Sequence, residues 1–134
     1  MYPIEAAGFI LDVGDGGEGI IGKLNGRKVV AIDPIKRELL ETQNEALKIV
    51  MDATDLKFLP KSFDACTTFF CFMYIPNEKY LQVFEQVHRV LKDGGKFLIC
   101  DVNIPENTGD FDAFIVRLKV RLPNEEIETG YGTL

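Results

Sequence analysis

The stretch FILDVGDGGEGIIG, residues 9–22, decides how the rest of the chain is interpreted. An apolar run ends in Asp12 and is followed by Gly14, Gly16 and Gly19, the spacing G-x-G-x-x-G. Glycines at these positions permit a tight turn between a strand and a helix, and they let backbone N–H groups approach a ligand. The stretch therefore predicts a strand, a ligand-binding turn and a helix.

Strand and helix patterns alternate along most of the chain, which is typical of βαβ units and a parallel sheet. We expect strands at 9–13, 28–32, 47–51, 64–72 and 96–102, and helices at 17–24, 34–43 and 77–91. In the last helix, Leu81, Phe84, Val87 and Leu91 should form one buried face, with the glycines of KDGG at its C-cap. In residues 111–122 one face of a half-exposed strand is predicted, because positions 114, 116, 118, 120 and 122 alternate with Ile115, Arg117, Lys119 and Arg121. After it the chain forms one more short strand or frays.

The composition indicates a single globular domain over residues 1–134. With 46% hydrophobic and 27% charged residues, the chain has neither an apolar run of membrane-spanning length nor a signal-peptide pattern, so we expect a cytoplasmic protein. The net charge of −6 argues against binding to nucleic-acid phosphates and favours small-molecule partners. Cys66, Cys71 and Cys100 lie in apolar runs without metal-ligand spacing, so we expect buried free thiols and no metal.

The residue at the end of the second strand narrows the choice of ligand. Asp33 follows the first glycine of the turn by 33 − 14 = 19 residues, where a carboxylate can accept hydrogen bonds from both ribose hydroxyls of an adenosine. Two adenosine ligands compete, a dinucleotide and S-adenosylmethionine. The turn carries Asp12, Asp15 and Glu18 without a Lys or Arg, and each carboxylate near a pyrophosphate would cost on the order of 1–4 kcal/mol at 4 Å. These acids suit the sulfonium and ammonium groups of S-adenosylmethionine better.

Five fragments in order resemble the class I S-adenosylmethionine-dependent methyltransferases, particularly the type 11 and quinone-biosynthesis-like branch. LDVGDGGEG is similar to the glycine motif DxGxGxG, and VVAID to the ribose-binding strand end. MDATDLKFLPKSFD resembles the adenine-binding segment, FDACTTFFCFMYIPN the fourth strand and its loop, and VHRVLKDGGKFLICD the RVLKPGG turn and fifth strand.

This resemblance implies a Rossmann-like three-layer α/β sandwich with a mostly parallel sheet. Its strand order would be 3-2-1-4-5-7-6. The last strands would be antiparallel, and they would be either complete or truncated. Asp52 would bond the adenine amino group, and Ala53 would offer its backbone N–H. The full implied cofactor set is Asp12, Gly14, Asp15, Gly16, Gly19, Asp33, Pro34, Asp52, Ala53, Thr68 and Phe69.

The acceptor side is expected after the fourth strand, at Phe70, Met73 and Tyr74. These side chains favour a small apolar or aromatic acceptor. No catalytic residue need stand out, because the methyl group of a sulfonium is already activated and positioning supplies much of the rate. Tyr74 is either a base or an aromatic wall, and His88 is expected on the apolar face of its helix. The tetrad and dipeptide signatures of nucleic-acid methylation are absent.

The chain also departs from the family it resembles. Glu18 stands where the third glycine of the motif is expected, and only eight residues precede the first strand, which leaves the acceptor side open. A homodimer, a large acceptor or a trimmed domain would each account for the open side. Three functions therefore remain: a small-molecule methyltransferase, a methyltransferase-like binding subunit without activity, and a dinucleotide-dependent oxidoreductase.

Overall fold

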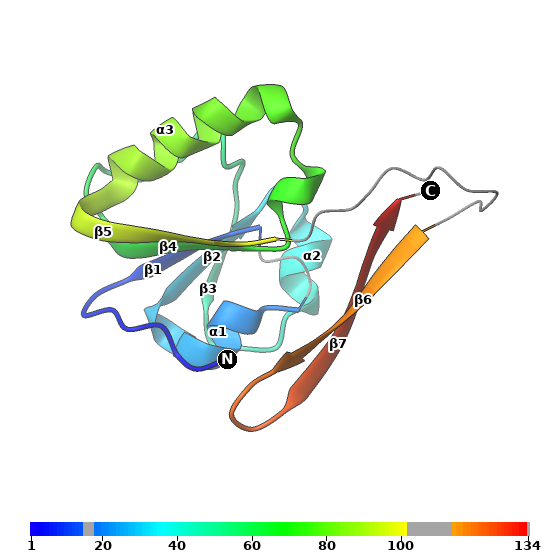
Figure 1. Cartoon of the computed structure of the whole chain (residues 1–134). Coiled ribbons are helices and arrows are strands. Elements are labelled where there is room, and N and C mark those ends of the chain that lie inside the picture. Colours follow the sequence, from blue (N-terminus) through cyan, green and yellow to red (C-terminus); the bar gives the residue numbers. More distant parts are fainter. Residues whose placement is uncertain (15–17, 102–113, 134) are drawn as a thin grey trace.

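A computed structural model gives the fold and describes every residue except 15–17, 102–113 and 134. Five parallel strands form the central sheet in the order β3-β2-β1-β4-β5 (Figure 1). Their bounds are β1 Ile10–Val13, β2 Val29–Asp33, β3 Leu47–Val50, β4 Phe63–Phe69 and β5 Leu91–Cys100. The prediction of a mostly parallel, Rossmann-like sheet is confirmed.

The last two strands, β6 Phe114–Arg121 and β7 Glu126–Thr133, are antiparallel, as expected. They form a two-stranded sheet of their own, so the expected order holds as 3-2-1-4-5 but the 7-6 pair is not joined to β5. The period-2 pattern of β6 is confirmed, because Val116, Leu118 and Val120 are more buried than the residues between them. The pair stands beside the rest of the chain in Figure 1.

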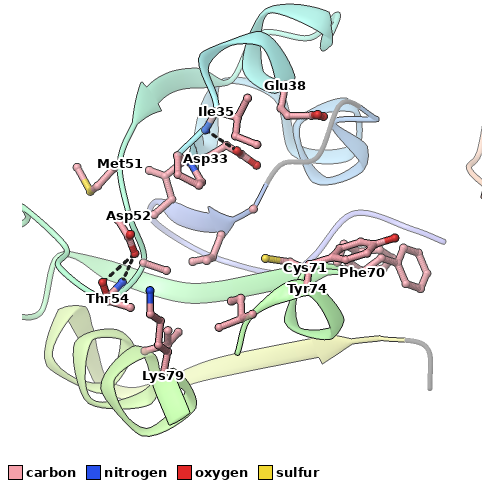
Figure 2. Close-up of a pocket in the computed structure, with 18 of the residues that line it drawn as sticks. Asp33, Ile35, Glu38, Met51, Asp52, Thr54, Phe70, Cys71, Tyr74 and Lys79 are labelled. Atoms are coloured by element: carbon pink, nitrogen blue, oxygen red, sulfur yellow. Dashed lines mark hydrogen bonds between the residues drawn. The ribbon is translucent and has the colours of Figure 1, made fainter. Parts of the chain in front are cut away.

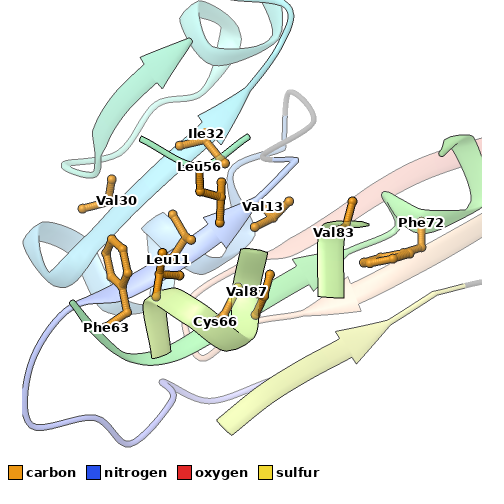
Figure 3. Close-up of a cluster of buried hydrophobic side chains, with 11 residues drawn as sticks. Leu11, Val13, Val30, Ile32, Leu56, Phe63, Cys66, Phe72, Val83 and Val87 are labelled. Carbon is orange, nitrogen blue, oxygen red and sulfur yellow. The ribbon is translucent and has the colours of Figure 1, made fainter. Parts of the chain in front are cut away.

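Helices cover both faces of the sheet, which gives three layers (Figure 1). Helix α3, Tyr80–Val90, lies over one face, and α1, Ile20–Asn25, and α2, Lys36–Glu41, lie over the other. Eleven buried side chains fill the α3 side, among them Leu11, Val13 and Ile32 from the central strands (Figure 3). Because β1 and β2 are buried along their whole length, their carboxyl ends are held firmly where a ligand would bind.

Two helices begin later than the sequence suggested. Gly19 has φ +59 in the left-handed region, so α1 starts at Ile20 rather than at residue 17. Helix α2 starts at Lys36 rather than at Pro34, because Ile35 is extended and donates its N–H to Asp33 Oδ1 at 2.8 Å. The Asp33 side chain thus forms a local turn that competes with the first helical turn.

The predicted buried face of α3 holds at Val87, and Leu91, just after the helix, packs partly buried against the core, but it was wrong at Leu81 and Phe84. Val83, Val87 and Val90 face the core, whereas Leu81 is 68% and Phe84 40% exposed. The valines follow an i, i+4, i+7 spacing, which places them on one stripe of the helix toward the sheet. His88, expected on the apolar side, is exposed.

The glycines of KDGG do not cap α3. The helix ends at Val90, and Leu91 donates its N–H to Val87 O before pairing with Phe63 in the sheet. The pairing register then shifts between Phe63 and Ala65, and Gly94, with φ +77, lies in that irregularity. The chain has therefore already left the helix when it reaches the glycines.

Strand β4 also ends earlier than expected, at Phe69, and Phe72–Tyr74 form a short 3₁₀ turn. The expectation of three buried thiols holds only for Cys66. Cys71 is half-buried in the loop after β4, and Cys100 at the end of the edge strand is exposed. All three are free.

Candidate functional site

A cavity of about 440 Å³ opens at the carboxyl ends of β1, β2 and β4, beside the segment that follows β3. This is where open α/β sheets bind ligands. Figure 2 shows three groups around it: Asp33, Ile35 and Glu38; Asp52, Thr54 and Lys79; and Phe70, Cys71 and Tyr74. The predicted residues Gly14, Pro34, Ala53 and Phe69 line it as well.

The first group begins with Asp33 at the end of β2. The residue is only 7% exposed, and its Oδ1 accepts the N–H of Ile35 at 2.8 Å. That bond fixes the rotamer of the side chain, so the carboxylate is held at the cavity wall before any ligand arrives. Glu38 lies beside it on α2, where burial, together with the charges of Glu41 and Asp33, raises the pKa of Glu38.

The second group is centred on Asp52, which follows β3. Asp52 Oδ1 accepts hydrogen bonds from Thr54 N at 2.9 Å and Thr54 Oγ1 at 2.8 Å. These bonds, and the charge of Lys79 to a smaller degree, lower the pKa of Asp52. Asp52 is therefore an oriented, ionised acceptor, and Ala53 beside it also lines the cavity.

The third group is apolar and aromatic. Phe70 has φ +54, an uncommon conformation for a bulky residue, and its N–H donates to Cys100 O at 2.7 Å. Tyr74 is 58% exposed at the cavity. Strained backbone that is held by the surrounding structure is common at ligand sites. Met73, predicted beside them, does not line the cavity, and its N–H donates to Asp101 Oδ2 at 3.0 Å.

Two predicted cofactor residues lie behind the cavity. Asp12 is 2% exposed and accepts a hydrogen bond from Thr67 Oγ1 at 2.7 Å, so it ties β1 to β4. Thr68 is fully buried beside Cys71. Burial raises the pKa of the Cys71 thiol to about 11. Cys71 is thus a neutral wall residue at neutral pH.

The structure describes both ends of the glycine turn, at Gly14 and at Glu18. Gly14 donates its N–H to Ile32 O at 2.8 Å, has φ +72, and leaves no room for a side chain because Cys71 Sγ lies against it. Asp15 and Gly16, both predicted to bind the cofactor, lie outside the described residues. Glu18 lines the cavity and accepts a hydrogen bond from Thr129 Oγ1 of β7, which links the turn to the β6–β7 pair.

Sequence reasoning missed Ile35, Glu38, Cys71 and Lys79 as cavity residues. Ile35 and Glu38 follow Asp33 closely, so the position of the acid could have indicated them. Lys79 carried no local signal, because its place depends on how the loop after β4 returns toward β3. Among the described residues, no group of three His, Cys, Asp or Glu side chains could hold a metal ion. Nor does a described helix have the length and apolar character needed to cross a membrane.

Comparison with known proteins decides the family. The sequence profile of the methyltransferase domain matches residues 11–99, which include nearly all of the five-stranded sheet and all of the cavity lining. The chain belongs to the methyltransferase domain family. Class I members of this family use S-adenosylmethionine as the methyl donor, and S-adenosylmethionine is the cofactor of this domain.

Individual proteins resemble the chain in sequence or in fold. The chain is 28% identical over 105 residues to the sterol 4-C-methyltransferase strm-1 of Caenorhabditis elegans, covering 78% of this chain and 30% of that protein. The PH0226 structure from Pyrococcus horikoshii OT3 matches with a TM-score of 0.64 and 22% identity, over 92% of this chain and 66% of its own. The BH2331 structure from Bacillus halodurans C-125 matches with a TM-score of 0.66 and 26% identity, over 78% and 48%. The chain therefore spans less than two thirds of these relatives.

The cavity fits a cationic donor. Its described lining carries four carboxylates, those of Glu18, Asp33, Glu38 and Asp52, and one cationic side chain, Lys79. Such a lining attracts a sulfonium and an ammonium and repels a pyrophosphate, in agreement with the charge argument drawn from the turn. The balance of charge therefore favours S-adenosylmethionine over a dinucleotide.

Proposed function

We propose that this chain binds S-adenosylmethionine in the cavity and transfers its methyl group to a small apolar or aromatic acceptor. The observation that carries the proposal is the division of the cavity into two chemical halves. Asp33 and Asp52 stand on one side as oriented carboxylates, and Phe70 and Tyr74 form an aromatic side (Figure 2). One half suits a polar nucleoside, and the other suits an apolar molecule.

The described residues have separate tasks in this proposal. Asp33 accepts hydrogen bonds from the ribose hydroxyls. Asp52 and the backbone N–H of Ala53 form hydrogen bonds with the edge of the adenine. When bound, S-adenosylmethionine would supply an activated methyl group, which a nucleophile on the acceptor attacks as the sulfur–methyl bond breaks and S-adenosylhomocysteine leaves. The protein then needs to orient the two molecules and exclude water, which supplies much of the rate of such a reaction. Tyr74 is assigned to the aromatic wall that orients the acceptor.

The acceptor class follows from the aromatic half. Phe70, Tyr74 and Ile75 offer aromatic and aliphatic surface and no charge. The C. elegans relative is named for a sterol, which adds a large apolar acceptor to the candidates. A second copy of the chain could cover the exposed Tyr74 side and complete the acceptor pocket. Sterols, quinols and small phenols are therefore the acceptors to test first.

The proposal is tested by following S-adenosylhomocysteine formation with this acceptor panel. We expect turnover with at least one apolar acceptor, and we expect Phe70→Ala to raise the KM of the acceptor while leaving the Kd of S-adenosylmethionine within about twofold. Binding without turnover on any acceptor would favour the binding-subunit alternative. Binding of NADH in place of S-adenosylmethionine would overturn the proposal in favour of an oxidoreductase.

A further inference from the structure

We propose that Asn44 is a positioning residue that holds the cofactor-binding turn from outside the cavity; the inference rests on the proposed function of that cavity. Asn44 lies in the segment between α2 and β3, and it does not line the cavity. Its Nδ2 donates to Gly19 O at 3.0 Å, and its Oδ1 accepts the N–H of Ala46 at 3.0 Å. One side chain thus joins the end of the turn to the segment that leads into β3.

The glycines of α1 provide the space for this contact. A Cβ at Gly19 would meet Asn44 Nδ2 and the Thr42 side chain within 3 Å, and a Cβ at Gly22 would meet three atoms of the Asn44 amide group within 3 Å. Gly22 needs no unusual φ, since among the described glycines only Gly14, Gly19, Gly26 and Gly94 have positive values. Its lack of a side chain is therefore explained by packing against Asn44 rather than by backbone conformation.

The two ends of the turn are fixed by different means. Gly14 is held to β2 by its N–H bond to Ile32 O at 2.8 Å, a backbone contact that involves no side chain. Gly19 is held by the Asn44 side chain, a contact that depends on this residue. Glu18, which lines the cavity, precedes Gly19 directly. A shift of the Gly19 carbonyl would therefore move a cavity residue.

Losing the Asn44 bond should not unfold the chain. Gly19 O also accepts the N–H of Lys23 at 3.0 Å, so the carbonyl keeps one partner when the amide group is removed. A buried carbonyl left without any partner would cost much more. The expected effect is consequently on the placement of the turn rather than on the existence of the fold.

The test compares Asn44→Asp with a matched variant, Asn25→Asp. Asn25, at the other end of α1, also makes two bonds to backbone, donating Nδ2 to Ile4 O at 2.9 Å and accepting Ile4 N at 3.1 Å. Each Asp keeps the acceptor and loses the donor. Calorimetric titration should show the Kd of S-adenosylmethionine about tenfold higher in Asn44→Asp and unchanged within about twofold in Asn25→Asp. The kcat at saturating donor should be unchanged in both.

Two further measurements separate positioning from stability. Amide hydrogen exchange at Lys23 of the ligand-free protein should quicken in Asn44→Asp and not in Asn25→Asp.

Gly22→Ala, which displaces the Asn44 amide, should weaken binding in the wild-type background but not in Asn44→Ala, where the space is vacant. Equal affinities in the two Asp variants would overturn the inference. If the wild type binds no S-adenosylmethionine, the proposed function fails, and the exchange rates at Lys23 decide the positioning claim alone.

Discussion

The carboxylate of Asp33 is the cavity group whose removal we expect to be most informative. Asp33→Asn keeps the size of the side chain. It also keeps an oxygen that can accept the N–H of Ile35, which lies 2.8 Å from Oδ1 in the wild-type protein. It replaces the second oxygen with an NH₂ group, which cannot accept a hydroxyl proton. The substitution therefore removes one acceptor and one negative charge while leaving the local turn in place.

The structure sets the magnitude of the effect. Oδ1 already accepts the N–H of Ile35, so Oδ2 is the oxygen left to accept a strong hydrogen bond from a ribose hydroxyl. A hydrogen bond to a charged group contributes about 1.5–3 kcal/mol, and its loss raises Kd by a factor of roughly 10–150. Asp33→Ala should cost more stability than Asp33→Asn, because it also deprives the Ile35 N–H of its partner.

The assay is isothermal titration of S-adenosylmethionine into wild-type protein, Asp33→Asn and a control, Asp64→Asn. Asp64 also accepts a backbone N–H, that of Gly8 at 2.6 Å, and pairs with Lys92 at 2.7 Å, but it does not line the cavity. We expect the affinity to fall only in Asp33→Asn. A Kd within twofold of wild type in that variant would refute the assignment of Asp33 to the ribose.

Three further outcomes are expected. Thr129→Val, which removes the hydroxyl bonded to Glu18, should loosen the β6–β7 pair and speed its cleavage in limited proteolysis, and an unchanged cleavage rate would contradict a role of this contact in holding the pair. Iodoacetamide at pH 8, followed by peptide mass spectrometry, should label the exposed Cys100 first. Cys71, with a pKa of about 11, should react roughly a hundredfold more slowly than an ordinary thiol, and faster labelling of Cys71 would contradict its burial. Because hydrogen bonds from Thr54 lower the pKa of Asp52, the folded state favours the ionised carboxylate. Its contribution to stability is present above the unfolded-state pKa and is lost as the pH falls through the folded-state pKa. The Tm difference between wild type and Asp52→Asn should therefore shrink on acidification, and a constant difference would count against this reading.

The sheet and the donor side of the cavity were predictable because their signals are local. Gly14 and Asp33 each mark the end of a buried strand, and parallel strands bring their carboxyl ends to one edge. The order of the strands came from the family resemblance and not from periodicity. Spacing and resemblance together were enough to place Asp33, Asp52 and Ala53 around one cavity.

The errors arose where tertiary contacts override local pattern. Leu81 and Phe84 are larger apolar residues than Val83, yet the stripe of valines packs on the sheet. Phe70 was expected inside a strand and instead turns at the cavity with φ +54. The contact of Thr129 with Glu18 joins residues that are 111 positions apart, and nothing in either local sequence indicates it. Side-chain packing between distant segments is what the sequence pattern does not contain.

The central claim is that S-adenosylmethionine binds in the cavity at the carboxyl ends of β1, β2 and β4, beside the segment that follows β3, and a ¹⁵N NMR titration tests it most directly. The account predicts saturable shifts of the Gly14, Ile35 and Ala53 amides, which line the cavity. The amides of Gly94 and Gly130, which do not line it, should remain in place. Absence of shifts at saturating ligand, or shifts confined to residues outside the cavity, would contradict the account.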